Sequence, residues 1–240
     1  MATYYVGWDV GAWYCDGRGS QDAIVVCDSN KTTVFEGRKV IRTELNECSI
    51  CGFLNKFFEK ACFSEKDVFC LAIDAVFGFP YAMKELINGR LYPLPDNAEA
   101  WAPESSINNP ILFRCTERYV KGVKKMPMSV VQNNIASQSS KLIYFLRHFE
   151  FLQTEIGIWQ SGKHQAIETY PSLLGTKGDD LQDAGLCADF AKDFFATAPQ
   201  DRFRRFHCPV DAMNKTREAY VMDIIKSEGW IWFRKGNTVK

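Results

Sequence analysis

The run Val68-Phe69-Cys70-Leu71-Ala72-Ile73, which Asp74 follows, decides the fold. It is a continuous apolar segment of strand length, and such a run is typical of a central strand that is covered on both faces. Residues Tyr4 to Val10 predict another buried strand, which ends at Gly11. We therefore expect a layered α/β domain in which helices cover a sheet built around these strands.

Two more strands are predicted before Val68, at Ala23–Cys27 and Thr32–Ile41, joined by the turn residues Asp28-Ser29-Asn30. A helix is predicted between them and Val68, because apolar residues recur there at helical spacing. These residues are Ile50, Phe53, Leu54, Phe57, Phe58 and Ala61. The order strand, strand, strand, helix, strand agrees with an α/β fold.

The pattern becomes irregular after the Val68 strand, and we predict a large insertion there, at about residues 77–155 of a single 1–240 domain. A long helix is marked by Val131, Ile135, Leu142, Leu146 and Phe149. Beyond it the sequence predicts two strands and then two helices. Their ranges are Ile156–Trp159, Gln165–Thr169, Leu181–Phe195 and Asp211–Lys226.

The composition is that of a globular protein, with 46% hydrophobic and 24% charged residues among 240. Lys plus Arg and Asp plus Glu are 29 each, so the net charge is zero and any binding of a polyanion needs a local basic patch. The N-terminus lacks the features of a signal peptide, and the apolar stretch from Val68 to Pro80 is too short to span a bilayer. We therefore predict a cytoplasmic protein without a membrane partner.

Three acidic residues stand where predicted strands end, namely Asp9, Asp74 and Glu168. An acidic side chain in an apolar strand is costly to bury unless it is paired or binds a metal. Open α/β sheets build their sites at the carboxyl ends of strands, and a hard divalent cation removes the repulsion between clustered carboxylates. The pattern favours a shared metal or acid/base site, with Mg²⁺ or Mn²⁺ as the expected cation. The alternatives for each residue are a helix N-cap or a partner for a buried Arg.

A fourth acidic residue, Asp211, opens the last predicted helix, and an N-cap role would explain it fully. Two basic stretches are also present, one from Arg114 to Lys125 and one from Arg202 to Arg205. Either is a solvated face or, if it lies near the carboxylates, a clamp for a phosphate.

The segment from Gly157 to His164 is a near miss for a phosphate-binding P-loop. His164 stands where the motif has Ser or Thr, and a strand follows where the motif needs a helix. A hairpin turn explains this segment better. Lys163 in that turn is kept as a candidate substrate-binding residue.

The chain also resembles the ribonuclease H-like predicted nucleases grouped as domain-of-unknown-function family 429. The resemblance is carried by short pieces that run in the family's order along nearly the whole chain. They are Val6-Gly7-Trp8-Asp9, Ile73-Asp74 with Gly78-Phe79-Pro80, Phe113-Arg114-Cys115-Thr116-Glu117, Ile167-Glu168-Thr169-Tyr170-Pro171, Asp211-Ala212-Met213 and Glu228-Gly229-Trp230-Ile231.

The resemblance implies a ribonuclease H-like mixed sheet of five strands, the first three antiparallel, with helices on both faces. It also implies a catalytic site formed by Asp9, Asp74, Glu168 and Asp211, the first three as ligands of Mg²⁺ or Mn²⁺. Accessory, substrate-binding roles are implied for Arg114, Thr116 and Glu117.

The leading hypothesis from these residues is metal-dependent hydrolysis of phosphodiesters, as in a nuclease acting on nucleic acid. One alternative is phosphoryl transfer from a nucleotide, although the proteins of related fold that do this normally need two such domains. A second alternative is a non-catalytic module that binds nucleic acid or protein. The sequence does not decide the substrate or the oligomeric state.

Overall fold

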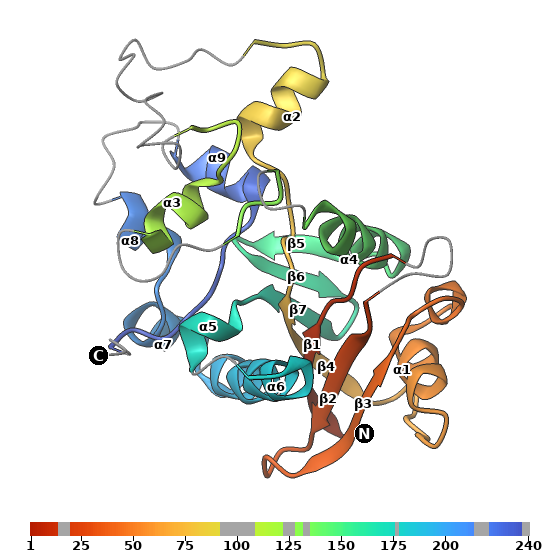
Figure 1. The fold of residues 1–240 in the computed structure, drawn as a ribbon. Helices are drawn as coiled ribbons and strands as arrows, with labels where there is room; N and C mark the ends of the chain where they lie inside the picture. The colour runs from red at the N-terminus through yellow and green to blue at the C-terminus, as the bar shows by residue number, and fades with distance from the viewer. Residues whose placement is uncertain are drawn as a thin grey trace.

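The computed structural model describes residues 1–13, 20–91, 109–121, 128–131, 135–175, 178–213 and 221–236. Within this part of the chain, seven strands form one mixed sheet in the order β3-β2-β1-β4-β7-β6-β5 (Figure 1). The strands are β1 (Thr3–Asp9), β2 (Asp22–Cys27), β3 (Thr33–Lys39), β4 (Val68–Asp74), β5 (Leu152–Glu155), β6 (Ile158–Ser161) and β7 (His164–Glu168).

The α/β class and the antiparallel pairing of the first three strands are confirmed, but the five-stranded ribonuclease H-like sheet is wrong. β1 and β7 both run parallel to β4, and β6 and β5 then extend the sheet as an antiparallel meander. Gly157 and Gly162 have positive φ angles of 72° and 53°, which suit the two tight turns of this meander. β5 is mostly exposed and lacks alternating apolar residues, so its sequence gives no strand signal.

The helices agree with the predictions where the apolar period is strong. α6 (Asp180–Ala196) begins and ends within one residue of the predicted helix Leu181–Phe195. α1 (Ile50–Phe58) and α4 (Ala136–His148) lie inside the ranges predicted for them. The range of the last predicted helix contains part of α8 (Pro209–Met213) and most of α9 (Val221–Glu228), and residues 214–220 between them lie outside the described part. The shorter helices that had no sequence signal are α2 (Tyr81–Ile87), α3 (Cys115–Lys121), α5 (Pro171–Leu174) and α7 (Pro199–Arg205).

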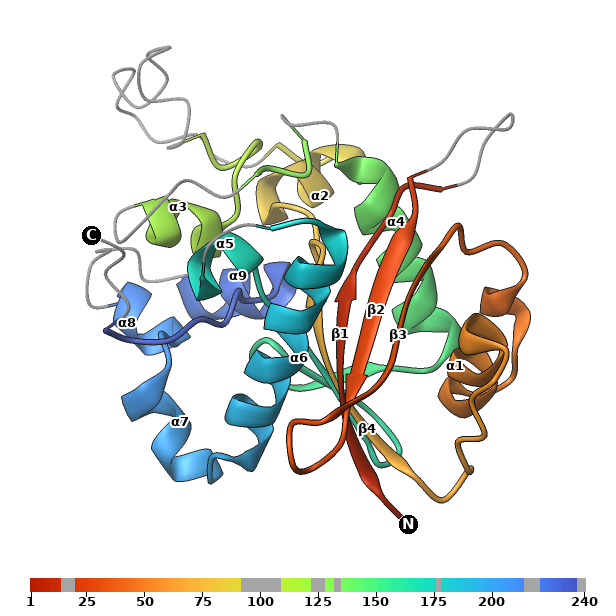
Figure 2. The ribbon, with the colours of Figure 1, turned by 60° about the horizontal axis from the view of Figure 1, so that its bottom comes forward.

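Helices cover both faces of the sheet (Figure 2), and buried hydrophobic residues form a core on each side of it. On one face, α1 and α4 pack on side chains such as Trp8, Leu71 and Ile73. On the other face, α6 packs on β1, β2 and β4. Beside α6, residues of α3, α9 and the segment Trp230–Phe233 form another hydrophobic cluster on the same face. Because β4 is covered on both sides, its continuous apolar sequence is explained.

Gly7 allows α6 to approach β1 closely. A Cβ atom at Gly7 would lie 1.8 Å from the Ala184 carbonyl oxygen and 2.3 Å from the Ala188 nitrogen, both in the α6 backbone. No side chain fits in that space, so the sequence Gly7-Trp8-Asp9 serves helix–sheet packing. Since side chains alternate along a strand, Asp9 lies on the same face as Gly7 and projects at the α6 side.

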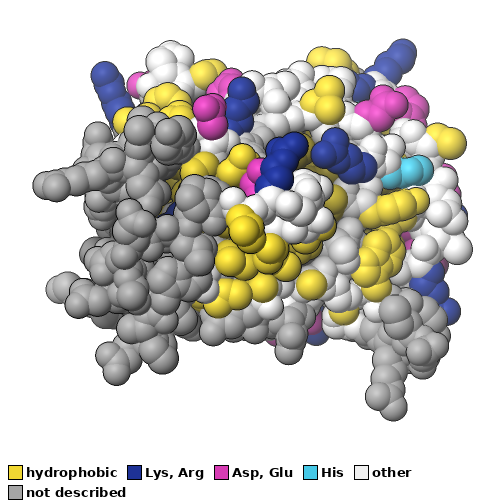
Figure 3. Space-filling model, turned by 90° about the horizontal axis from the view of Figure 1, so that it is seen from above, with side chains coloured by type: hydrophobic (Ala, Val, Ile, Leu, Met, Phe, Trp, Pro, Cys, Tyr) yellow, Lys and Arg dark blue, Asp and Glu magenta, His cyan; other side chains and the backbone are white. Residues whose placement is uncertain are grey.

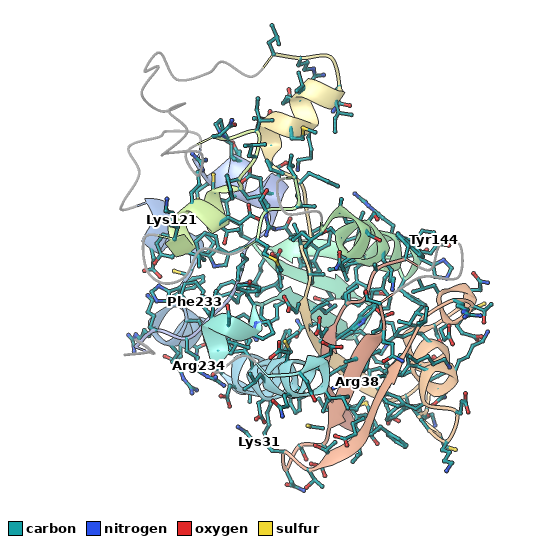
Figure 4. All side chains as sticks on the ribbon, in the orientation of Figure 1. Lys31, Arg38, Lys121, Tyr144, Phe233 and Arg234 are labelled. Atoms are coloured by element: carbon teal, nitrogen blue, oxygen red, sulfur yellow. The ribbon has the colours of Figure 1, made fainter. Side chains whose placement is uncertain are left out.

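Ion pairs with basic residues from other elements hold α6 in place. Arg38 of β3 pairs with Asp179, the N-cap residue of α6, at 2.7 Å, while Lys31 and Arg234 both pair with Asp193 near its C-terminal end. Figure 4 shows these three basic residues arranged around the helix. The position of α6 beside Asp9 is therefore set mainly by packing, because partly exposed ion pairs of this kind contribute little stability.

The surface carries charges of both signs. Figure 3 shows Lys, Arg, Asp and Glu side chains scattered around a group of hydrophobic ones on the face seen from above. On that face the described residues form no continuous basic track. Among the helices that the structure describes, none combines the length and the apolar character needed to cross a membrane.

Replacing Gly7 by Ala is expected to destabilise the protein by about 3 kcal/mol, because the new methyl group overlaps backbone atoms that cannot rotate away. Urea unfolding of the variant and the wild type measures the difference in the free energy of unfolding.

Gly185→Ala is the matched control, since a Cβ atom at this α6 position meets nothing within 4 Å. It should raise stability by about 0.5–1 kcal/mol, because Ala favours a helix interior over Gly. Equal effects of the two substitutions would contradict the close approach of α6 to β1.

Candidate functional site

Asp9 and Asp74 are direct neighbours at the carboxyl ends of β1 and β4. They are register partners in the parallel pairing of these strands. Adjacent strands are about 4.8 Å apart, and paired residues of parallel strands project to the same side. The two carboxylates therefore start from adjacent backbone positions and face the same way, as the sequence predicted.

A pocket with a volume of about 90 Å³ opens at these strand ends. Asp9, Asp74 and Glu168 all line it, so the structure brings together the three acidic residues that the sequence singled out. The remaining lining residues come from the chain after β1, β4 and β7 and from the region of α4. They are Val10, Ala75, Val76, Arg114, Met128, Ile135, Gln138, Ser139, Thr169, Tyr170 and Ile231.

The charges of Asp9 and Asp74 also act on the α6 side of the sheet. Burial raises the pKa of the Cys187 thiol well above its usual value, and the charges of Asp74 and Asp9 raise it further. Tyr170 on the pocket wall has a raised pKa as well, first because of burial and then because of Asp74. The Tyr170 phenol on the pocket wall and the Cys187 thiol in the core beneath it therefore both stay protonated at neutral pH.

Glu168 is bound by a buried arginine. Arg114 donates from both terminal nitrogens to the two Glu168 oxygens, with 2.8 Å between Nη1 and Oε2, and its side chain is fully buried. The backbone N–H of Phe77 donates to the same Oε2 at 3.1 Å. Glu168 therefore has the buried Arg partner that the sequence analysis held open as an alternative to metal binding.

Glu117 completes this cluster from the first turn of α3. Its two oxygens accept from the Arg114 Nε at 2.8 Å and from the Arg114 backbone nitrogen at 2.9 Å. Burial raises the pKa of Glu117 to about 7, although Arg114 opposes this shift. Burial also lowers the pKa of Arg114, but Glu168 and Glu117 outweigh that effect and raise it overall. Arg114 and Glu117 thus position Glu168 in the pocket wall.

A second buried ion pair fixes the backbone around Asp9. Asp22 accepts from the Trp8 indole at 3.1 Å, from the Gly11 backbone N–H at 3.0 Å and from the Lys141 ammonium at 2.8 Å. Asp22 and Lys141 are both fully buried. Since Trp8 and Gly11 flank Asp9, and Lys141 lies on α4, this cluster ties the end of β1 to the helix that forms the pocket wall. The sequence analysis missed both residues, because they lie 119 positions apart.

Three candidate residues lie outside the pocket. The Thr116 hydroxyl is buried and accepts from the Ile231 backbone N–H at 3.0 Å. Lys163 lies in the β6–β7 turn at the opposite end of β7 from Glu168, about 16 Å away along extended chain, and contacts the Glu65 carbonyl oxygen. Glu117 reaches the site only through Arg114. The positions of these three residues therefore give no support for direct contacts with a substrate.

Asp211 has a local structural role. Its side chain accepts from the Cys208 backbone N–H at 2.9 Å at the start of α8 and pairs with Lys235 at 2.9 Å. Asp211 is the third residue of α8 and its side chain reaches back to the residue before the helix, so it caps the helix from inside and is not the N-cap residue that the sequence predicted as the alternative. Asp211 does not line the pocket with Asp9 and Asp74.

The two basic stretches do not converge on the pocket in the described residues. Arg114 points inward and is buried, while Lys121 at the outer end of α3 is exposed (Figure 4). Lys124 and Lys125 lie outside the described part. Arg202 is buried against Phe194, and Arg204 is exposed. Among these residues only Arg114 lines the pocket.

Asp9 and Asp74 fit a magnesium-type ion better than the full set of three carboxylates does. In the part of the chain that the structure describes, no group of three or more His, Cys, Asp or Glu side chains is arranged to hold a metal. Mg²⁺ is usually held by one or two carboxylates and completes its shell with water and substrate phosphate. A pair of carboxylates beside a pocket large enough for several waters meets that need.

Gln138 and Ser139 are pocket residues that the sequence analysis missed. They lie in the first turn of α4. In the sequence they have the pattern of ordinary polar residues on a helix, which does not indicate a site. The Ser139 hydroxyl donates to the Ile135 carbonyl oxygen at 3.0 Å, whereas the buried Gln138 Oε1 accepts no hydrogen bond from the residues that the structure describes.

Comparison of the chain with protein-family models, with curated proteins and with solved structures finds no match. The resemblance to family 429 therefore stays a prediction, and a function can be inferred only from the geometry of the pocket.

Removing Arg114 should be strongly destabilising, because Glu168 and Glu117 then remain buried without their cation. Arg114→Met is expected to cost about 3–5 kcal/mol in the free energy of unfolding. The cost should be smaller at pH 5 than at pH 8, since the stranded carboxyl groups are neutralised by protonation at the lower pH.

Arg204→Met is the control, because the Arg204 side chain is 86% exposed. It should change stability by less than about 0.5 kcal/mol. Denaturant unfolding at both pH values tests the pair, and a similar small cost for both variants would show that the buried cluster is unimportant.

The His164 side chain should make stability depend on pH. Burial lowers its pKa to about 4, with a smaller effect of Lys163, and its Nδ1 accepts from the Phe69 backbone N–H at 3.1 Å. Between pH 6.5 and 4 the unfolded chain takes up a proton that the folded one refuses, so stability falls as the pH is lowered through this window.

His164→Asn keeps an acceptor for Phe69 and removes the titration. The free energy of unfolding of wild type relative to this variant is expected to fall as the pH decreases from 6.5 to 4. Parallel pH profiles for the two proteins would show that His164 is not buried in its neutral form.

Proposed function

We propose that the protein hydrolyses phosphodiesters at the Asp9–Asp74 pocket with the help of Mg²⁺ or Mn²⁺. The observation that carries this proposal is the in-register position of two aspartates at the ends of adjacent parallel strands, on the floor of a pocket. Open α/β sheets place their sites at this edge. The reaction is the one that the sequence suggested, with Asp9 and Asp74 as the ligands of the cation.

Asp9 and Asp74 would bind the cation through their carboxylate oxygens. When bound, Mg²⁺ or Mn²⁺ supplies Lewis-acid activation of a phosphoryl oxygen and of water. The chain's own contribution is to hold the two aspartates at a fixed separation, which the strand pairing does, and to orient the phosphate beside them. Glu168 lies in the same wall, where Arg114 neutralises its charge and so limits its repulsion of a phosphate.

The pocket volume of about 90 Å³ agrees with a substrate whose phosphate enters the pocket while the remainder stays outside.

Millimolar Mg²⁺ or Mn²⁺ should raise the melting temperature, because a ligand that binds only the folded state stabilises it by about 2.7 kcal/mol at 100 times its dissociation constant. Asp9→Asn and Asp74→Asn are each expected to abolish this shift. They should also reduce metal-dependent cleavage of a mixed RNA and DNA substrate by more than about 100-fold.

Asp211→Asn is the matched control. The same loss of charge outside the pocket should leave the metal-induced shift and the cleavage rate unchanged. Thermal melts with and without metal, together with a gel assay of cleavage, separate the cases. A wild-type protein that shows neither the shift nor cleavage, or an Asp9→Asn variant that retains both, would refute the proposed function.

A further inference from the structure

β3 is an edge strand whose outer backbone groups have no partner in the described part of the chain. It stands at the end of the strand order, where only β2 pairs with it (Figure 1). None of its residues is buried, and none forms a backbone hydrogen bond to a described residue outside the β2 ladder. An exposed edge of this kind can accept a further strand whose side chains fit its own. The side chains of β3 therefore decide which strand that is.

The sequence around Gly37 is complementary to itself in an antiparallel pairing. The segment reads Val34-Phe35-Glu36-Gly37-Arg38-Lys39-Val40. When Gly37 of one copy lies opposite Gly37 of another, Glu36 faces Arg38 on both sides of the two-fold axis. The flanking pairs are then Phe35 with Lys39, a ring and a cation, and Val34 with Val40. Opposite charges and apolar side chains that face each other across two strands stabilise their pairing.

Glu36 and Arg38 project to the same face of the sheet, as this pairing requires. Arg38 lies on the α6 side, because its Nη2 pairs with Asp179 at 2.7 Å, and side chains two residues apart on a strand point the same way. Its guanidinium has further N–H donors for a second carboxylate. Among the residues that the structure describes, none forms an ion pair with the exposed Glu36. The Glu36 carboxylate is thus available to Arg38 of a second copy.

Charge also restricts the register of such a pair. Facing residues must project to the same side of the sheet, so the neighbouring two-fold registers place either Glu36 opposite Glu36 or Arg38 opposite Arg38. Like charges directly opposite each other are destabilising. Many edge strands carry charges that keep other strands away. On β3 the two charges have opposite signs and flank Gly37 symmetrically, so they favour one register of self-pairing.

We infer that the protein forms a homodimer in which β3 of one copy pairs antiparallel with β3 of a second copy, with Gly37 at the two-fold axis. The interface is isologous, because both copies contribute the same strand. The two sheets join into one continuous sheet, and two Glu36–Arg38 ion pairs set the register. The inference is independent of the proposed function, since β3 contributes no residue to the Asp9–Asp74 pocket.

Glu36→Arg and Arg38→Glu test this interface by charge. Each variant alone brings like charges together on both sides of Gly37 and is expected to raise the dimer dissociation constant by at least about 10-fold. An equimolar mixture of the two variants pairs opposite charges at both positions again, so it should form a heterodimer with an affinity close to that of wild type. Sedimentation velocity over a series of protein concentrations measures these dissociation constants.

Glu155→Arg is the matched control, because it makes the same change on β5, the edge strand at the other end of the sheet. It should leave dimerisation unchanged. Thermal melts establish that each variant is folded. A wild-type protein that stays monomeric up to millimolar concentration would overturn the inference. Single variants that dimerise like wild type, or a mixture that dimerises no better than the single variants, would also overturn it.

Discussion

The buried guanidinium of Arg114 is the interaction on which the surroundings of the pocket depend. It binds Glu168 at the end of β7, Glu117 in α3 and the Glu228 carbonyl oxygen at the end of α9. Glu168 in turn accepts from the Phe77 N–H after β4. Four segments that are distant in the sequence therefore meet at one cation. Such a buried cluster adds little net stability, because desolvation offsets the attraction, but every wrong arrangement of these segments leaves a charge unpaired.

Glu228 extends the same constraint to the helices after β4. Its carboxylate accepts from the Tyr81 N–H at the start of α2 and from the Cys115 N–H at the start of α3, both at 2.7 Å. One buried carboxylate thereby satisfies N-terminal donors of two helices. Burial raises the pKa of Glu228, and the two backbone donors oppose the shift. The insertion predicted after the fourth strand is thus attached to the sheet by buried polar contacts.

The sequence could indicate the elements with strong apolar patterns and the residues that end them, but not contacts between distant positions. Asp9 and Asp74 follow apolar strands, and their adjacency follows from the parallel pairing of those strands. Arg114 and Glu168 are 54 residues apart, so neither residue reveals which partner the other has. β5 was missed because an exposed edge strand needs no apolar alternation. Lys163 precedes the strand that Glu168 ends, so it lies at the other end of β7 and does not line the pocket.

The pocket lies between two fully buried ion pairs, and this explains how a small site can be rigid without ligand. Asp22 holds the residues on both sides of Asp9 and is itself paired with Lys141, one turn beyond Gln138 on α4. Arg114 holds Glu168 on the opposite wall. Each pair connects a strand to another element, so the floor and the walls of the pocket are joined by buried contacts. An active site needs its groups held to within a fraction of an ångström, and charges that cannot be buried singly are an effective means of holding them. On this view the energetic cost of burying Lys141 and Arg114 singly is the physical reason why Asp9 and Glu168 keep their places at the pocket.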